Sequence, residues 1–119
     1  MNDKKMPDDH PATKQKKLEH FKTATASTLR AIAGKHDLDI TFSASEAPGD
    51  ARLRGLQRSQ KLPLPDRALS SEDAALVRGD ADAKALRHRH HNPSAHRANA
   101  PMDLTAQAAF DALEQARCE

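Results

Sequence analysis

The sequence contains few large apolar residues and almost no aromatic ones. Of its 119 residues, 18 are Leu, Ile, Val or Phe, Trp and Tyr are absent, and the aromatic residues are Phe21, Phe42 and Phe110. This share of about 15% lies below the roughly 20% at which a chain can no longer offset the entropy lost on ordering. An independent enzyme with a deep active-site cleft is therefore not expected.

Cysteine and long hydrophobic runs are scarce as well. Cys118 is the single cysteine, so we expect neither an intrachain disulfide nor a thiolate zinc site. So close to the end of the chain, its thiol is expected to be hard to enclose. The start of the sequence lacks the apolar run of a signal peptide, and no stretch approaches about 18 apolar residues. We therefore expect a soluble, cytoplasmic protein that does not contact membranes.

Alanine and balanced charge are abundant. The sequence has 22 alanines, and 19 Lys and Arg stand against 17 Asp and Glu, a net charge of +2. The small net charge leaves little self-repulsion, and alanine is the best helix former. Together these features predict a mainly α fold with about three amphipathic helices, one short strand or small β element, and long loops.

The first half of the chain divides into a leader, a helix and a strand. Residues 1–16 lack apolar periodicity and are predicted to be a disordered leader, followed by a helical domain over 17–119. Apolar spacings of three and four predict a helix that Gly34 ends, and one face of it would hold Leu18, Phe21, Thr25, Leu29 and Ile32. The alternating Leu38, Ile40 and Phe42 predict a strand, which needs a partner to be stable. Residues 44–67 are predicted to be a loop, to which Arg52–Arg54 or Lys61–Leu62 could add a short extended piece.

Two further helices are predicted in the second half. Ser70 would cap the first and Pro93 would bound it, with a fresh turn from Ser94; its face would hold Val77, Ala81, Ala85 and His88. Asp103 or Thr105 would cap the last helix, with Ala106, Phe110 and Leu113 on one face. That helix has no stop signal before Glu119, so we expect a domain that is incomplete at its C-terminus.

A group of histidines is the most conspicuous candidate for chemistry. His88, His91 and His96 could bind zinc, copper, nickel or cobalt, which favour imidazole. Against this, no Asp, Glu or Cys is expected within reach, and Arg87 and Arg89 add positive charge. Histidines also favour helix C-termini because of the macrodipole. We favour a solvated helix end, and we assign no catalytic, cofactor-binding or metal residue beyond these three weak candidates.

Two other sequence patterns could indicate a binding site, and in both cases we favour the interpretation without one. The segment 78–97 carries a local excess of Lys and Arg that could bind phosphate, but no aromatic residue interleaves it for base stacking, so nucleic acid is not an expected partner. Asp39–Ser43 matches a D-x-[ST]-x-S pattern used for magnesium in adhesion domains. The residues before it do not form the buried strand that such a site needs, and we interpret the match as coincidence.

Three stretches together resemble a known family. These are Phe21–Ala33 with Leu38–Phe42, then Arg78–Arg87 with His91 and His96-Arg97, and finally Ala109–Arg117. Their order and spacing are similar to the N-terminal portion of the T subunit of the aerobic cobaltochelatase, the CobT family, from about Lys17 to Glu119.

The resemblance implies a role in ATP-dependent insertion of cobalt into hydrogenobyrinic acid a,c-diamide. In that family the T subunit works with an AAA+ ATPase subunit as a ring-shaped assembly, which acts on a large porphyrin-binding subunit. ATP, Mg and cobalt would be used by the complex, and none would be bound by this chain.

The sequence also departs from the family. Members are several times longer and end in an integrin-like domain with an adhesion-type metal motif, which is absent here, and the His88–His90 run and Pro93 are unusual. We therefore expect a fragment or truncated product that serves as an assembly domain without catalytic residues. The alternative is a small His-rich protein that binds cobalt, nickel or zinc.

Overall fold

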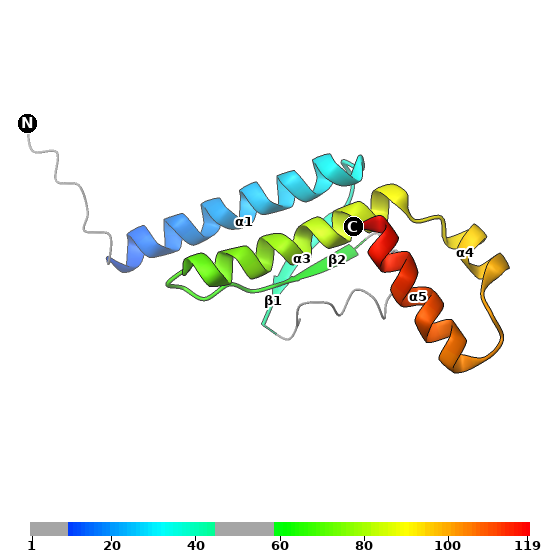
Figure 1. Ribbon diagram of the computed structural model, residues 1–119. Coiled ribbons are helices and arrows are strands. Elements are labelled where there is room, and N and C mark those ends of the chain that lie inside the picture. The colour runs from blue at the N-terminus through cyan, green and yellow to red at the C-terminus, as the bar shows by residue number, and fades with distance from the viewer. Residues whose placement is uncertain (1–9, 45–58) are drawn as a thin grey trace, which may run out of the picture.

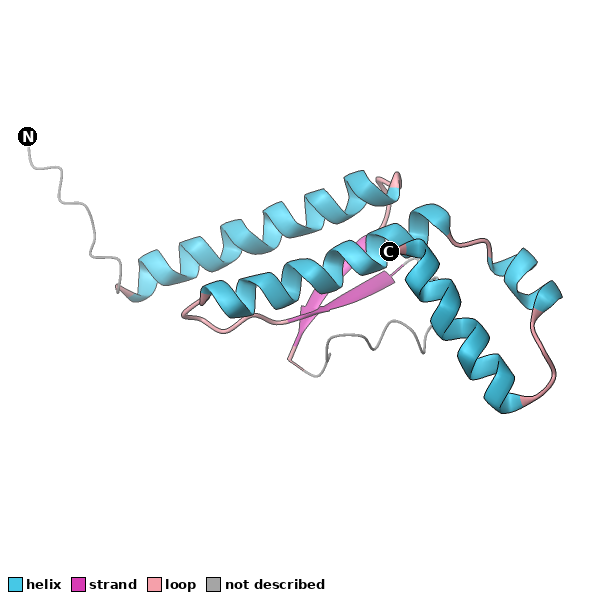
Figure 2. Ribbon diagram, viewed as in Figure 1, coloured by secondary structure: helices cyan, strands magenta, loops and turns pink. Residues whose placement is uncertain are grey.

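The computed structural model describes residues 10–44 and 59–119 and shows a mainly helical chain with a small sheet (Figure 1, Figure 2). This confirms the predicted fold class. The elements in chain order are α1 (Pro11–Ala33), β1 (Asp39–Ser43), β2 (Ser59–Pro63), α3 (Ser71–His90), α4 (Pro93–Asn99) and α5 (Leu104–Cys118). No helix among the described residues is both long and apolar enough to cross a membrane.

Helix α1 begins earlier than the sequence pattern indicated. The backbone N–H of Ala12 donates to Nδ1 of His10, and Pro11 occupies the first helical position, where its fixed φ and missing N–H are tolerated. The leader predicted at 1–16 is therefore too long, because residues 11–16 are helical; residues 1–9 lie outside the described part of the chain. At the other end Gly34 has φ +70° and caps the helix, as predicted.

The partner of the predicted strand is β2, which lies within the segment predicted as a loop. The two strands pair in parallel, from Asp39 opposite Ser59 to Ser43 opposite Pro63. This confirms the extended piece at Lys61–Leu62, whereas Arg52–Arg54 lies outside the described residues. The sequence signal for β2 is weak because Pro63 ends it and cannot donate to a sheet.

The core lies where α1, α3 and the sheet meet. Figure 1 shows α1 and α3 side by side with both strands against them. The central cluster of buried side chains is small and rich in alanine, and it consists of Leu29, Ala33, Leu38, Leu62, Ala81 and Ala85. Alanines on α3 let the two helices approach closely, so little apolar volume suffices to fill the space between them.

Helix α3 is built as the sequence predicted. The hydroxyl of Ser70 accepts from the N–H of Asp73 at its start, and Val77, Ala81 and Ala85 are buried. Within the helix, Lys84 Nζ donates to Asp80 Oδ2 at 2.7 Å and to the carbonyl of Lys61 on β2. Both side chains are almost fully buried, so this pair also joins α3 to the sheet.

Helix α5 is capped by Asp103, one of the two predicted caps, and most of the predicted apolar face is exposed. Leu113 is 70% exposed and Ala106 is exposed, while Gln115 and Cys118 are buried. The inward face of α5 is instead fixed by polar contacts with α3 and α4. Pro93 does more than bound α3, since it also begins α4.

Candidate functional site

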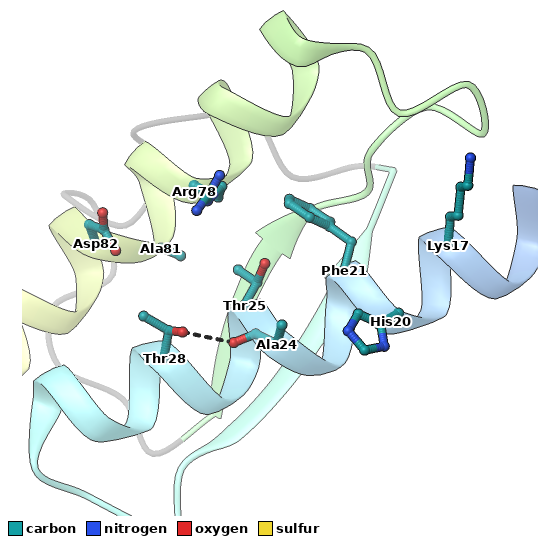
Figure 3. A pocket seen from close by; sticks show the side chains of 9 residues that line it. All are labelled: Lys17, His20, Phe21, Ala24, Thr25, Thr28, Arg78, Ala81 and Asp82. Atoms are coloured by element: carbon teal, nitrogen blue, oxygen red, sulfur yellow. Dashed lines mark hydrogen bonds between the residues drawn. The ribbon is translucent and has the colours of Figure 1, made fainter.

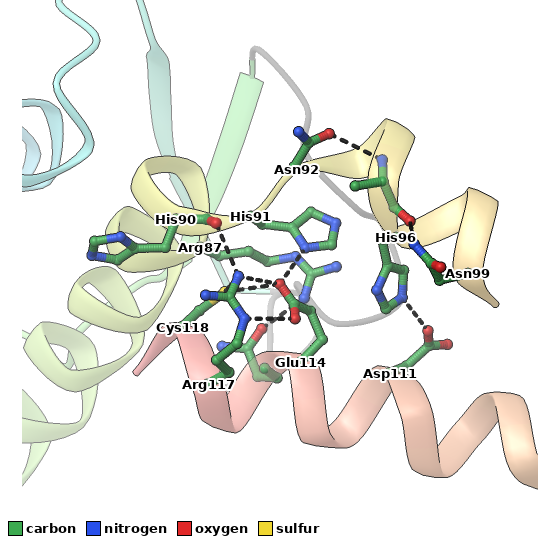
Figure 4. Close-up of polar contacts among 12 residues, drawn as sticks. Arg87, His90, His91, Asn92, His96, Asn99, Asp111, Glu114, Arg117 and Cys118 are labelled. Carbon is green, nitrogen blue, oxygen red and sulfur yellow. Dashed lines mark hydrogen bonds and ion pairs between the residues drawn. The ribbon is translucent and has the colours of Figure 1, made fainter.

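Helices α3 and α5 meet at the C-terminal end of α3, and the contacts between them are largely polar (Figure 4). Nη1 of Arg87 donates to Oε1 of Gln115 at 2.8 Å, and both side chains are buried. Arg117 Nη2 donates to the carbonyl of His90 at 3.0 Å, which satisfies one of the free carbonyls at the end of α3. These bonds bring the last residues of α3 and α5 together.

Three chemically different side chains converge at this junction. His91, the C-cap residue of α3, has its Nδ1 3.0 Å from Oε1 of Glu114. The thiol of Cys118 donates to the same oxygen at 3.5 Å. Because Glu114 and Cys118 are four residues apart, they lie on one face of α5. A nitrogen, an oxygen and a sulfur atom thus all lie within 4.8 Å of one another.

Arg117 neutralises this cluster. Its Nε donates to Oε2 of Glu114 at 2.9 Å and its Nη2 to Oε1 at 2.6 Å. Hydrogen bonds from Arg117, and then from His91, hold the pKa of Glu114 well below its usual range. Burial, followed by the charge of Glu114, raises the pKa of the Cys118 thiol. At neutral pH the cluster therefore contains a carboxylate, a guanidinium and a protonated thiol.

His96 on α4 adds a second contact with α5. Its Nε2 lies 2.7 Å from Oδ1 of Asp111, and its ring stacks on Phe110 with centroids 4.3 Å apart. The rings of His96 and His91 are also in contact, with centroids 5.0 Å apart in an edge-to-face arrangement. Asp111 is exposed, so the ion pair itself contributes little. The stacking and the paired nitrogen fix the orientation of the imidazole.

A second concave feature lies between α1 and α3 (Figure 3). It is a groove of about 440 Å³, lined by Lys17, His20, Phe21, Ala24, Thr25, Thr28, Arg78, Ala81 and Asp82. The hydroxyl of Thr28 donates to the carbonyl of Ala24 at 2.9 Å, so that donor is already engaged. Cations and a carboxylate both reach the groove, and this mixture favours no single class of ligand.

Comparison with known proteins identifies the family. The model of the family described as cobalamin biosynthesis protein CobT matches residues 15–119. The chain belongs to the CobT family. Membership associates it with cobalamin biosynthesis and confirms the resemblance found in the sequence. No solved structure matches the chain.

The three candidate histidines of this CobT-family chain do not form one group. His91 and His96 are brought together, but Nδ1 of His88 lies 3.1 Å from Nζ of Lys35, in the loop after α1. Burial and the nearby charges of Lys35 and Arg87 lower the pKa of His88 to about 4, so it is neutral at physiological pH. His88 therefore belongs to the interface between α3 and α1.

One argument made against a metal site, and the separate expectation that the Cys118 thiol would be hard to enclose, were wrong. Glu114 and Cys118 are within reach of His91, although no Asp, Glu or Cys was expected there. The thiol of Cys118 is also enclosed, with 3% of the residue exposed. Both residues were missed because they lie 23 and 27 positions after His91 in the sequence. The local signal that was available is their spacing of four on a helix that returns to the histidine segment.

The basic segment of this CobT-family chain is not a continuous basic surface. Lys84 and Arg87 are buried and are used within the fold, in the pair with Asp80 and the bond to Gln115. Arg89 is exposed but donates to the carbonyl of Ile32. The Asp39–Ser43 pattern forms strand β1 itself, rather than following a strand as the adhesion-type site requires.

Proposed function

We propose that this chain is an assembly domain of the T subunit of the aerobic cobaltochelatase. It would support ATP-dependent insertion of cobalt into hydrogenobyrinic acid a,c-diamide in the cytoplasm, in a complex with an AAA+ ATPase subunit and a large porphyrin-binding subunit. ATP, Mg and cobalt would be used by that complex. The observation that supports the proposal is the match to the CobT family over residues 15–119.

The outward face of α5 is the surface that best suits this role. Its polar inward face contacts α3 and α4, and the opposite side of the helix is apolar and exposed. The residues of this outward face share one side by helical spacing, and they are Ala106, Ala109, Leu113 and Ala116. Small residues around one leucine let another helix approach closely. We assign this surface to the AAA+ ATPase subunit.

Co-purification tests the proposal. The chain is expressed with the AAA+ subunit and the large subunit of the cobaltochelatase, and the binding affinities are measured with purified components. Leu113→Lys places a charge in the centre of the outward face, and we expect it to weaken binding to the AAA+ subunit by about tenfold or more, as the loss of a central interface anchor does. Because Leu113 is 70% exposed, the fold should not change.

Leu76→Lys is the matched control, because Leu76 is 60% exposed on α3 and lies far from the outward face of α5 in sequence. Its affinity for the AAA+ subunit should equal that of the wild type. If the wild-type chain associates with neither subunit, the proposed function is wrong. If Leu76→Lys weakens binding as much as Leu113→Lys, the assignment of the surface is wrong.

A further inference from the structure

The three donor atoms at the end of α3 already approximate a metal coordination shell. Tetrahedral zinc, with bonds of about 2.0 Å to nitrogen and oxygen and about 2.3 Å to sulfur, needs ligand atoms roughly 3.3–3.7 Å apart. The distance between His91 Nδ1 and Glu114 Oε1 is 3.0 Å, and that between Cys118 Sγ and Glu114 Oε1 is 3.5 Å. All three atoms lie within 4.8 Å of one another, so side-chain rotations would bring them onto one ion.

The donor set also selects the kind of ion. Imidazole, carboxylate and thiolate together suit zinc and cobalt, whereas magnesium and calcium prefer oxygen ligands. Three protein ligands leave a fourth position for water or an exogenous ligand, as in open zinc sites. The side chain of His91 is 4% exposed and that of Glu114 is 16% exposed, so the helices shield the site from most of the solvent.

A cation already occupies the open side of this cluster. Nη2 of Arg117 lies 2.6 Å from Glu114 Oε1 and 4.0 Å from Cys118 Sγ, close to where a metal ion would have to lie (Figure 4). The side chain of Arg117 is 58% exposed, so it can move into solvent, with the loss of its hydrogen bond to the carbonyl of His90. The guanidinium and a metal ion would therefore compete for the same carboxylate oxygen.

We propose that His91, Glu114 and Cys118 form a binding site for a divalent transition metal such as Zn²⁺ or Co²⁺, in which the ion replaces the guanidinium of Arg117. Binding uses the Nδ1 lone pair of His91 and releases the thiol proton of Cys118 to solvent as the sulfur–metal bond forms. The site goes beyond the proposed assembly function, because it requires no partner subunit. The buried guanidinium of Arg87 nearby adds positive charge, so the affinity should be moderate.

The test titrates the reduced, tag-free full chain with Co²⁺ and follows the thiolate-to-cobalt charge-transfer band in the near ultraviolet. The wild type should show this band with a dissociation constant below about 10 μM, and Zn²⁺ should displace the cobalt. His91→Ala and Cys118→Ser should abolish the band. His90→Ala is the matched control, because this neighbouring histidine is exposed and outside the cluster; it should bind as the wild type does.

Arg117→Gln provides a test that does not depend on disturbing the buried residues. It removes the competing charge but keeps a side chain of similar polarity, and we expect Co²⁺ to bind about tenfold more tightly, which corresponds to roughly 1.4 kcal/mol. Absence of the charge-transfer band in the wild type overturns the proposal. So does a band that survives Cys118→Ser, or an Arg117→Gln variant that binds more weakly than the wild type.

Discussion

Gly34 and Gly79 allow the same Gly→Ala substitution to be tested in two different backbone conformations. Gly34 has φ +70° at the end of α1, whereas Gly79 lies inside α3 without a positive φ, and a Cβ added at either position meets no atom within 4 Å. Steric contact is therefore excluded as a cause at both sites. What remains is the conformational preference of the backbone.

The expected changes in unfolding free energy have opposite signs. Gly79→Ala should stabilise the protein by about 0.8–1 kcal/mol, the difference in helix propensity between the two residues. At Gly34 the left-handed conformation costs an alanine roughly 1–2 kcal/mol, and the reduced entropy of the unfolded chain offsets about 0.4–1 kcal/mol of this. Gly34→Ala should therefore destabilise the protein by about 1 kcal/mol.

Urea unfolding, followed by the helical circular dichroism signal, measures both changes. A separation of about 2 kcal/mol between the two variants corresponds to roughly 1 M between their midpoints, for typical urea slopes of 1–3 kcal/mol per M. Gly34→Asn serves as a control, because asparagine tolerates the left-handed region, and it should fall between Gly34→Ala and the wild type. Shifts in the same direction at Gly34 and Gly79 would refute the reasoning.

Three other predictions concern the core and the buried charges. Leu29→Ala, at a fully buried site, should lower the free energy of urea unfolding by about 2–5 kcal/mol. The same change at exposed Leu113 should lower it by less than about 0.5 kcal/mol. Equal losses at the two positions would contradict the assigned core. The pKa of His88 is about 4 beside Lys35 in the folded chain and 6.5 when unperturbed. Between pH 4 and pH 6.5 the unfolded state therefore binds more protons than the folded state. The unfolding free energy of the wild type should therefore fall by about 2 kcal/mol as the pH falls from 6.5 to 4. The difference in unfolding free energy between wild type and His88→Gln should change over that pH range. A constant difference would show that His88 does not titrate in this way. Lys84→Met removes a buried ion pair and the bond to β2, and it should destabilise the chain by about 3–5 kcal/mol; a loss below 1 kcal/mol in thermal unfolding would mean that the pair is dispensable.

The features predicted correctly from the sequence are those set by neighbouring residues. Gly34, Ser70 and Asp103 cap their helices as expected, since a cap depends on contacts over two to four positions. The strand at Leu38–Phe42 was also recognised from its alternation, whereas its partner was recognised only as an extended piece at Lys61–Leu62 within a loop. Strand β2 is short and ends in proline, so little in the local sequence distinguishes it from a loop.

The candidate site could be predicted only in part, because it depends on how separate helices pack. His91 and His96 were recognised by residue type, but Glu114 and Cys118 become their neighbours only after α5 turns back onto α3. The inward face of α5 was not predicted, because hydrogen bonds of Arg87 and His91 orient that helix with Leu113 outward. Such polar contacts leave no periodic pattern in a sequence.

The parallel pairing of β1 and β2 has a consequence for the folding kinetics. Every paired residue lies 20 positions from its partner, as in Asp39 with Ser59, and parallel strands cannot be joined by a tight turn. The chain therefore loses loop-closure entropy before the first ladder bond forms, and a two-stranded sheet has little stability of its own to offset that loss. We expect the strands to pair only once α1 and α3 have packed, so the hydrogen-exchange protection of the ladder amides in β1 and β2 should report the separation of the two helices.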